Sequence, residues 1–251
     1  MKKLFPPMLD KPNDLAVNFG FSYWIVCFFV LPFILGFSTM RTRGQSYEIW
    51  LESGYHLLNF LLLLIFFLPY LRDSFLLVQV RTKTILKTAV FGGMAVALYK
   101  ICLPYISAYF GNIVLADTAF GSYITNESDL LFYSTAVIAQ EPIWGTLCMA
   151  VATPFTVSCL FYGTIFAPAC VNRPWLAYLL TAFTQLLIRL SMAFCLWPFQ
   201  EEMMIYFVQL PVHLLACWSY QKTDTIWTPI FLHMTANLIL APFTLAFVGI
   251  L

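Results

Sequence analysis

The sequence is poor in charge. Only 10% of its 251 residues are charged, whereas about a quarter are charged in a typical soluble domain, and 61% are hydrophobic. The formal net charge is +1, so the chain has no excess of positive charge to attract a polyanion such as a nucleic acid. This balance excludes an ordinary soluble domain and a nucleic-acid-binding protein, and it indicates a protein embedded in a lipid bilayer.

Common signatures of catalysis and metal binding are also missing. The chain contains no P-loop, no GxSxG and no HExxH sequence. Its seven cysteines stand in apolar stretches, with no CxxC pair and no metal-like spacing, so we interpret them as small buried hydrophobes and not as a disulfide framework. The first 14 residues are polar and precede an apolar run too long for a signal-peptide core, so no cleavable signal peptide is predicted.

The sequence instead contains seven long apolar stretches, each near the ~20 residues that a helix needs to cross a bilayer. Between the second and third, residues 75–87 form an amphipathic segment that we expect to lie along the membrane surface. The sequence therefore predicts an all-α, polytopic membrane helix bundle of about seven transmembrane helices, built as a single transmembrane domain over residues 1–251. The predicted spans are approximately 15–37, 56–71, 88–110, 143–170, 174–197, 203–219 and 226–251.

Basic residues give this bundle an orientation, because cytoplasmic loops are enriched in lysine and arginine. With the N-terminus inside, nine of the 13 basic residues fall in inner segments, two fall in outer segments, and Lys100 and Arg189 fall within spans. The long loop 111–142 holds four acidic residues and no basic one, as an outer loop should. The nine inner residues are Lys2, Lys3, Lys11, Arg72, Arg81, Lys83, Lys87, Arg173 and Lys222, and the two outer ones are Arg41 and Arg43.

Two histidines and an asparagine fall inside the last two spans, where burial is costly and a partner or a function is expected. His213 lies near the end of the sixth span and His233 near the start of the seventh. A short turn between antiparallel helices would place both about 10 Å below the inner surface, and Asn237 lies one turn beyond His233. Such a group either ligates zinc or forms hydrogen bonds across the bundle, and without a nearby carboxylate or thiolate we favour hydrogen bonds.

Other charged residues are harder to interpret from the sequence. Lys100 and Arg189 are mid-span cations that either snorkel, pair with buried amides such as Gln185, or line a cavity. Glu201 and Glu202 stand about 11 residues before the histidine of the sixth span, or some 16 Å along a helix. We expect both glutamates in a solvated turn at the outer interface.

The stretch LACWSYQKTDTIWTPIFLHMTANLI, residues 215–239, resembles the last characteristic block of the CAAX protease and bacteriocin-processing family of intramembrane metalloproteases. That block reads like "lGwlyerTGSlwpsIllHalnN" and ends in HxxxN, which His233 and Asn237 match here. The resemblance implies that these two residues are remnants of a catalytic site, within a family-like core at about 143–251. The other positions in register are Trp218, Tyr220, Lys222, Thr223, Thr225, Trp227 and Ile230.

The family's first motif, P-x-x-E-E-x-x-F-R-G, has a degenerate counterpart at residues 154–163. Val157 and Ser158 replace the two glutamates, and Tyr162 replaces the arginine. The second motif, FxxxH, has no histidine in the expected region, and Arg189 stands near its place. In the family a glutamate is thought to activate a water, which neither Val157 nor Ser158 can do near neutral pH. The motif positions that are kept are Pro154, Phe161 and Gly163.

Taken together, the resemblance implies a multi-pass membrane protein that has lost protease activity and has no cofactor. Its expected role is that of a binding or regulatory protein of the membrane, or a bacteriocin self-immunity protein, by analogy at the level of fold. Its expected partners are the lipid bilayer and another membrane protein or peptide. Because the family is common in bacteria, we expect a bacterial plasma membrane.

Two other interpretations stay open. One is an active intramembrane metalloendopeptidase with an atypical site, in which His213 and His233 bind zinc while Asn237 and a carboxylate such as Glu141 or Glu202 complete the site. The other is a small transporter whose two mid-span cations line a polar path.

Overall fold

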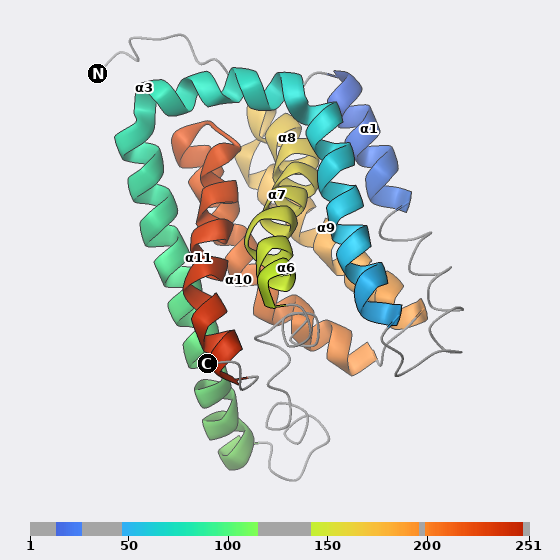
Figure 1. The fold of residues 1–251 in the computed structure, drawn as a ribbon, viewed down its shortest axis with the longest axis vertical. Coiled ribbons are helices and arrows are strands. Elements are labelled where there is room, and N and C mark those ends of the chain that lie inside the picture. The colour runs from blue at the N-terminus through green and yellow to red at the C-terminus, as the bar shows by residue number, and fades with distance from the viewer. Residues whose placement is uncertain (1–13, 27–46, 115–141, 196–198, 248–251) are drawn as a thin grey trace.

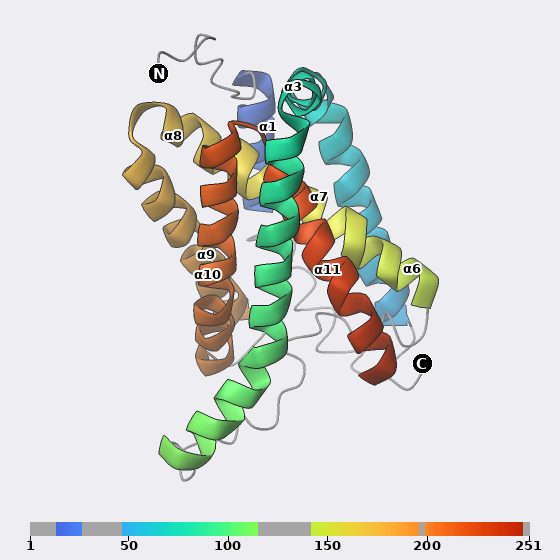
Figure 2. The same cartoon turned by 90° about the vertical axis from the view of Figure 1, so that its left-hand side faces the viewer.

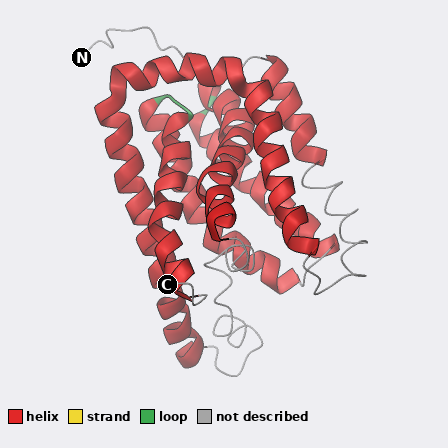
Figure 3. Ribbon diagram, in the orientation of Figure 1, coloured by secondary structure: helices red, strands yellow, loops and turns green. Residues whose placement is uncertain are grey.

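The computed structural model describes residues 14–26, 47–114, 142–195 and 199–247. Within these ranges the regular structure is entirely helical, which confirms the predicted all-α class (Figure 3). In chain order the elements are α1 (Asp14–Ile25), α3 (Tyr47–Val114), α6 (Pro142–Leu147), η3 (Cys148–Ala152), α7 (Thr153–Val157), η4 (Ser158–Phe166), α8 (Ala167–Asn172), α9 (Pro174–Cys195), α10 (Phe199–Thr223) and α11 (Trp227–Phe247).

Helix α3 forms three sides of a frame around the bundle. It runs along one side, crosses one end and returns along the other side (Figure 1). The backbone departs from helical geometry at Arg81, with φ −117° and ψ 24°. The second and third predicted spans are therefore two limbs of one bent helix, and the stretch that ends at the bend at Arg81, called the crossing stretch below, lies across the end of the bundle. The interfacial position predicted for residues 75–87 stays a prediction.

A nearly continuous helical path from α6 to α8 runs between the limbs of α3, and it contains two π-helical segments. The amide of Thr153 donates to the carbonyl of Cys148, and the amide of Ala167 donates to the carbonyl of Tyr162, each five residues back. A proline follows each of these amides. A proline ring has no N–H and crowds the carbonyl four residues earlier, so the wider π turn accommodates it. The degenerate first motif begins in α7 and continues into the second π-helical segment, η4.

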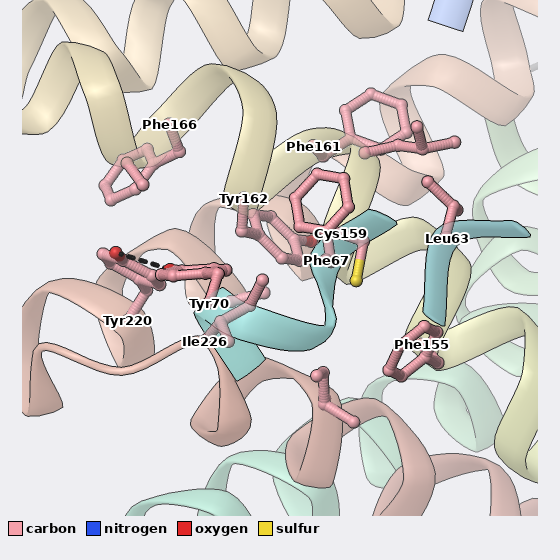
Figure 4. Close-up of a cluster of buried hydrophobic side chains, with 14 of the residues drawn as sticks. Leu63, Phe67, Tyr70, Phe155, Cys159, Phe161, Tyr162, Phe166, Tyr220 and Ile226 are labelled. Carbon is pink, nitrogen blue, oxygen red and sulfur yellow. Dashed lines mark hydrogen bonds between the residues drawn. The ribbon is translucent and has the colours of Figure 1, made fainter. Parts of the chain in front are cut away.

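Large apolar side chains fill the centre of the bundle and also cover much of its outside. Leu63 and Phe67 of α3 meet Phe155 and Phe161 of the central path in the buried cluster drawn in Figure 4. Large hydrophobic side chains are exposed on the outer faces, as lipid contact requires. They include Leu61, Ile65, Phe91 and Leu98 of α3, Leu179 and Phe183 of α9, and Phe207 of α10.

Two helical stretches within the described residues are long and apolar enough to cross a bilayer, Leu57–Leu103 and Ala150–Val171. Together with the apolar exterior, they are consistent with a membrane protein. The number of seven spans and the position of the N-terminus on the inner side of the membrane stay predictions.

Helices α3 and α11 lie close together because two adjacent glycines of α3 face α11. A Cβ atom on Gly93 would lie 2.6 Å from Cβ of Thr235 and 2.8 Å from the backbone oxygen of Leu232. A Cβ atom on Gly92 would lie 2.5 Å from Cδ1 of Leu232, the end of a flexible side chain. Small residues allow such close approach between helices in a membrane.

We expect Gly93→Ala to lower the free energy of unfolding by about 1–3 kcal/mol, because the new methyl group would meet backbone and force α3 and α11 apart. The matched variant Gly92→Ala should lie near the parent, since the Leu232 side chain can rotate away and alanine favours the helix. Unfolding by dodecyl sulfate in mixed micelles would measure both. Equal stabilities of the two variants would contradict this account of the α3–α11 contact.

Candidate functional site

Tyr162 stands at the centre of the only group in which the described residues bring both span histidines together. Its hydroxyl lies 2.8 Å from Nδ1 of His213 and 3.1 Å from Nε2 of His233. The tyrosine comes from η4, and the histidines come from α10 and α11, so one hydroxyl links three segments. Tyr162 is fully buried and belongs to the cluster shown in Figure 4.

The three rings are packed against one another as well as hydrogen-bonded. The rings of Tyr162 and His233 are stacked, with centroids 6.0 Å apart and an interplanar angle of 8°. The centroids of the two histidine rings are 6.1 Å apart, and Phe161 lies against His213 with a centroid distance of 5.2 Å. The two histidines therefore lie close together, while their depth in a membrane stays a prediction. Their metal role stays a prediction.

The hydrogen bonds among Tyr162, His213 and His233 require a particular distribution of protons. A phenol has one proton, so Tyr162 can donate to only one of the two histidine nitrogens. The other nitrogen must then donate its own proton to the phenol oxygen, and a protonated ring nitrogen has no lone pair for a metal. The hydroxyl also fills the space between His213 and His233, where an ion would need both nitrogens at about 2.0–2.1 Å. The hydroxyl of Tyr162 therefore occupies the facing nitrogens of both histidines with hydrogen bonds.

The described residues provide no third ligand either. They contain no group of three histidine, cysteine, aspartate or glutamate side chains that could hold a metal ion. Asn237 lies one helical turn beyond His233 on α11 and is half-buried. Glu141, a candidate carboxylate for a rebuilt site, lies outside the described residues.

At the positions of the family's glutamates, the structure has no acidic group. Ser158 is fully buried at the start of η4, and its hydroxyl has no hydrogen-bond partner among the described residues. Val157 is half-buried at the end of α7. Neither side chain offers a base to a water molecule, because a serine hydroxyl keeps its proton near neutral pH.

Arg189 forms a second buried polar group, on the side of the bundle where α9 meets α10. Its guanidinium donates to the carboxylate of Glu202 at 3.2 Å and to Oε1 of Gln209 at 2.7 Å. Glu202 is only 3% exposed, so the predicted solvated turn is wrong for this residue. The physical reason is that the antiparallel α9 supplies the half-buried Arg189, whose charge compensates the carboxylate. The side chain of Glu201 lies outside the described residues.

The mid-span cations do not pair with the amide suggested from the sequence. Gln185 is buried, and its Oε1 has no partner in the described part of the chain, because Arg189 binds Gln209 instead. Lys100, on the returning limb of α3, is half-buried.

With this geometry in view, comparison with known families is informative. Residues 130–239 match the family described as type II CAAX prenyl endopeptidase, Rce1-like. The match covers 110 of the 251 residues. The match contains the degenerate first motif and the HxxxN sequence of α11, and it confirms the resemblance drawn from the sequence. No curated protein and no solved structure matches the chain.

The role of Tyr162 was not foreseen from the family's first motif. The motif showed only that an arginine position holds tyrosine. A signal was nevertheless present, because a phenol within an apolar run needs a hydrogen-bond partner when it is buried. Two histidines were predicted at one depth in the neighbouring helices, and they are the partners that the tyrosine finds.

We expect Tyr162→Phe to lower the free energy of unfolding by about 1–3 kcal/mol, since two buried histidine nitrogens lose their common partner. Tyr178→Phe is the matched control, because it removes one exposed hydroxyl that donates to Gln221 at 2.8 Å. The control should cost about 1 kcal/mol or less. Unfolding in mixed micelles measures both. An unchanged free energy of unfolding in Tyr162→Phe would show that the hydrogen bonds of Tyr162 to the two histidines contribute nothing to stability.

We expect Arg189→Met to lower the free energy of unfolding by about 3–5 kcal/mol, because it leaves the Glu202 carboxylate buried without its cation. The double variant Arg189→Met, Glu202→Met should lower the free energy of unfolding by less than the single variant, since apolar side chains replace both charges. Arg81→Met provides the control. It breaks a pair with Asp224 whose two side chains are each 40% exposed, for about 1 kcal/mol or less. A double variant that is less stable than Arg189→Met would contradict this assignment.

Proposed function

We propose that the chain is a catalytically inactive relative of the CAAX prenyl endopeptidases that acts as a membrane-embedded binding or regulatory protein. The observation that carries this proposal is the position of the Tyr162 hydroxyl between His213 and His233. Catalysis by the family's mechanism needs free histidine lone pairs for a metal and a carboxylate beside the water. Here the facing nitrogens of the two histidines are engaged by Tyr162, and no described carboxylate joins them in a metal-binding group.

The polar group formed by Arg189, Glu202 and Gln209 argues against the alternative of a rebuilt protease site. Its described carboxylate, Glu202, is paired with Arg189. Glu202 also lies 11 residues before His213 on the same helix, or about 16 Å along the helix axis. A general base must come within hydrogen-bonding reach of the attacking water, and Glu202 is held far from the histidines.

A bundle without catalytic groups can still hold a partner. The proposed partner is another membrane protein or a peptide, and bacteriocin self-immunity is one role that family analogy suggests. We further propose seven spans in a bacterial plasma membrane, with the N-terminus inside. The segments that support this orientation are the crossing stretch of α3, the α8–α9 turn and the end of α10, which carry Arg72, Arg81, Arg173 and Lys222.

The first experiment is the metal content of the purified protein, measured by elemental analysis on the parent and on His233→Ala. We expect far less than one zinc per chain in both, because the histidine nitrogens are engaged by Tyr162. His56→Ala is the control for adventitious binding, since it removes the third histidine of the chain. About one zinc per chain that is lost in His233→Ala and kept in His56→Ala would overturn the proposal.

A cleavage assay completes this test. With a prenylated CAAX peptide, the kind of substrate that the family's description names, the parent and His233→Ala should both give no product. Cleavage by the parent that disappears in His233→Ala would restore the protease interpretation.

A further inference from the structure

A groove lies between the returning limb of α3 and α10, on the outside of the bundle and away from the histidines. It encloses about 470 Å³ and is open along one side. Figure 2 shows this limb of α3 running beside α10, near the end of the bundle that the helix crosses. The groove shares no residue with the Tyr162 group, so it calls for a separate explanation.

The groove is polar at one end and apolar along the rest. On α3, residues at steps of four line it in the order Lys83, Lys87, Phe91 and Ala95. Residues four apart share one face of a helix, and this row spans about 18 Å at 1.5 Å per residue. The lysines stand next to the crossing stretch, and the apolar residues lead along the limb towards the middle of the bundle.

Helix α10 repeats this order on the facing wall. Lys222 lies at the end near the crossing stretch, Trp218 follows one turn further in, and Leu215 lies beyond it. The ammonium group of Lys222 stands over the Trp218 ring at 4.5 Å from its centroid. A tryptophan at this depth is typical of the boundary between lipid headgroups and acyl chains.

The charge in the groove is of one sign. Lys83, Lys87 and Lys222 line it, and none of the described lining residues is acidic. None of these three lysines forms an ion pair with a described carboxylate. Asp224, the acidic residue nearest in sequence to Lys222, is engaged by Arg81 at 3.2 Å. Three exposed ammonium groups without a counter-ion attract an anion to this end of the groove.

We propose that the groove binds one anionic phospholipid, with its phosphate at Lys83, Lys87 and Lys222 and an acyl chain along Phe91, Ala95 and Leu215. The combination decides the ligand. A free phosphate explains the lysines and not the apolar wall, whereas an uncharged lipid explains the wall and not the lysines. An anionic lipid satisfies both, and basic pockets between transmembrane helices bind such headgroups. This inference does not depend on the inactivity proposed above.

The test is a titration of the full-length protein in neutral detergent with phosphatidylglycerol or phosphatidylcholine, in which native mass spectrometry counts the bound lipids. We expect one phosphatidylglycerol to bind at least about tenfold more tightly than phosphatidylcholine. In Lys87→Gln, Lys222→Gln this preference should fall by about tenfold or more. The charge-matched control is Arg72→Gln, Arg173→Gln, which removes two exposed charges outside the groove and should keep the preference.

Two further arms separate a lipid site from an anion site. Ala95→Trp fills the apolar part without changing the charge, so it should weaken phosphatidylglycerol binding and leave the lysines in place. Inorganic phosphate at millimolar concentration should not displace the lipid. If Ala95→Trp has no effect and phosphate displaces the lipid, the groove is a phosphate site and the proposal is wrong. If the arginine control loses as much of the preference for phosphatidylglycerol as the lysine variant, anionic lipid is attracted to this end of the protein in general. That result would also overturn the proposal.

Discussion

The hydroxyl of Tyr162 satisfies a constraint on which the interior of this bundle depends. Polar groups inside a membrane protein have no water to bind, so each must find its partner within the fold. One phenol serves His213 and His233 together, and in doing so it links η4, α10 and α11. The same contact occupies the two histidine nitrogens that face each other, which is the observation behind the proposed inactivity.

The turn between α10 and α11 sets the level of the two histidines, and the crossing stretch of α3 holds that turn. Ser74 bonds Thr225 at 2.9 Å, Arg81 pairs with Asp224 at 3.2 Å, and the indole of Trp227 donates to the carbonyl of Leu71 at 3.0 Å. Asp224 has φ 57°, a left-handed conformation that aspartate tolerates better than most residues. Further in, the hydroxyls of Tyr70 and Tyr220 lie 3.2 Å apart. The crossing stretch of α3 therefore holds the turn between α10 and α11, and with it the two histidines, in place.

The polar side chains of helix α10 have different surroundings on its different faces. His213 points into the bundle, towards Tyr162, while Trp218 and Lys222 are exposed beside α3. Glu202, near the start of the helix, binds Arg189 of α9. The inner faces carry compensated polar groups, and the outer face near the crossing stretch carries charge that nothing in the described structure compensates. This division is why we assign the first two groups to the fold and the lysines to a ligand from outside.

The sequence by itself determined the class of this protein, because hydrophobicity and the scarcity of charge are properties of each segment alone. It also determined the all-helical class and the resemblance to the matched family, since HxxxN on α11 and the degenerate motif around Ser158 are local patterns. Only the tertiary structure decided the pairings. That Tyr162 meets two histidines, that Glu202 is buried against Arg189, and that three lysines share one groove depend on the rotation and register of neighbouring helices. Spacing along the chain cannot specify these, because they are set by contacts between residues far apart in sequence.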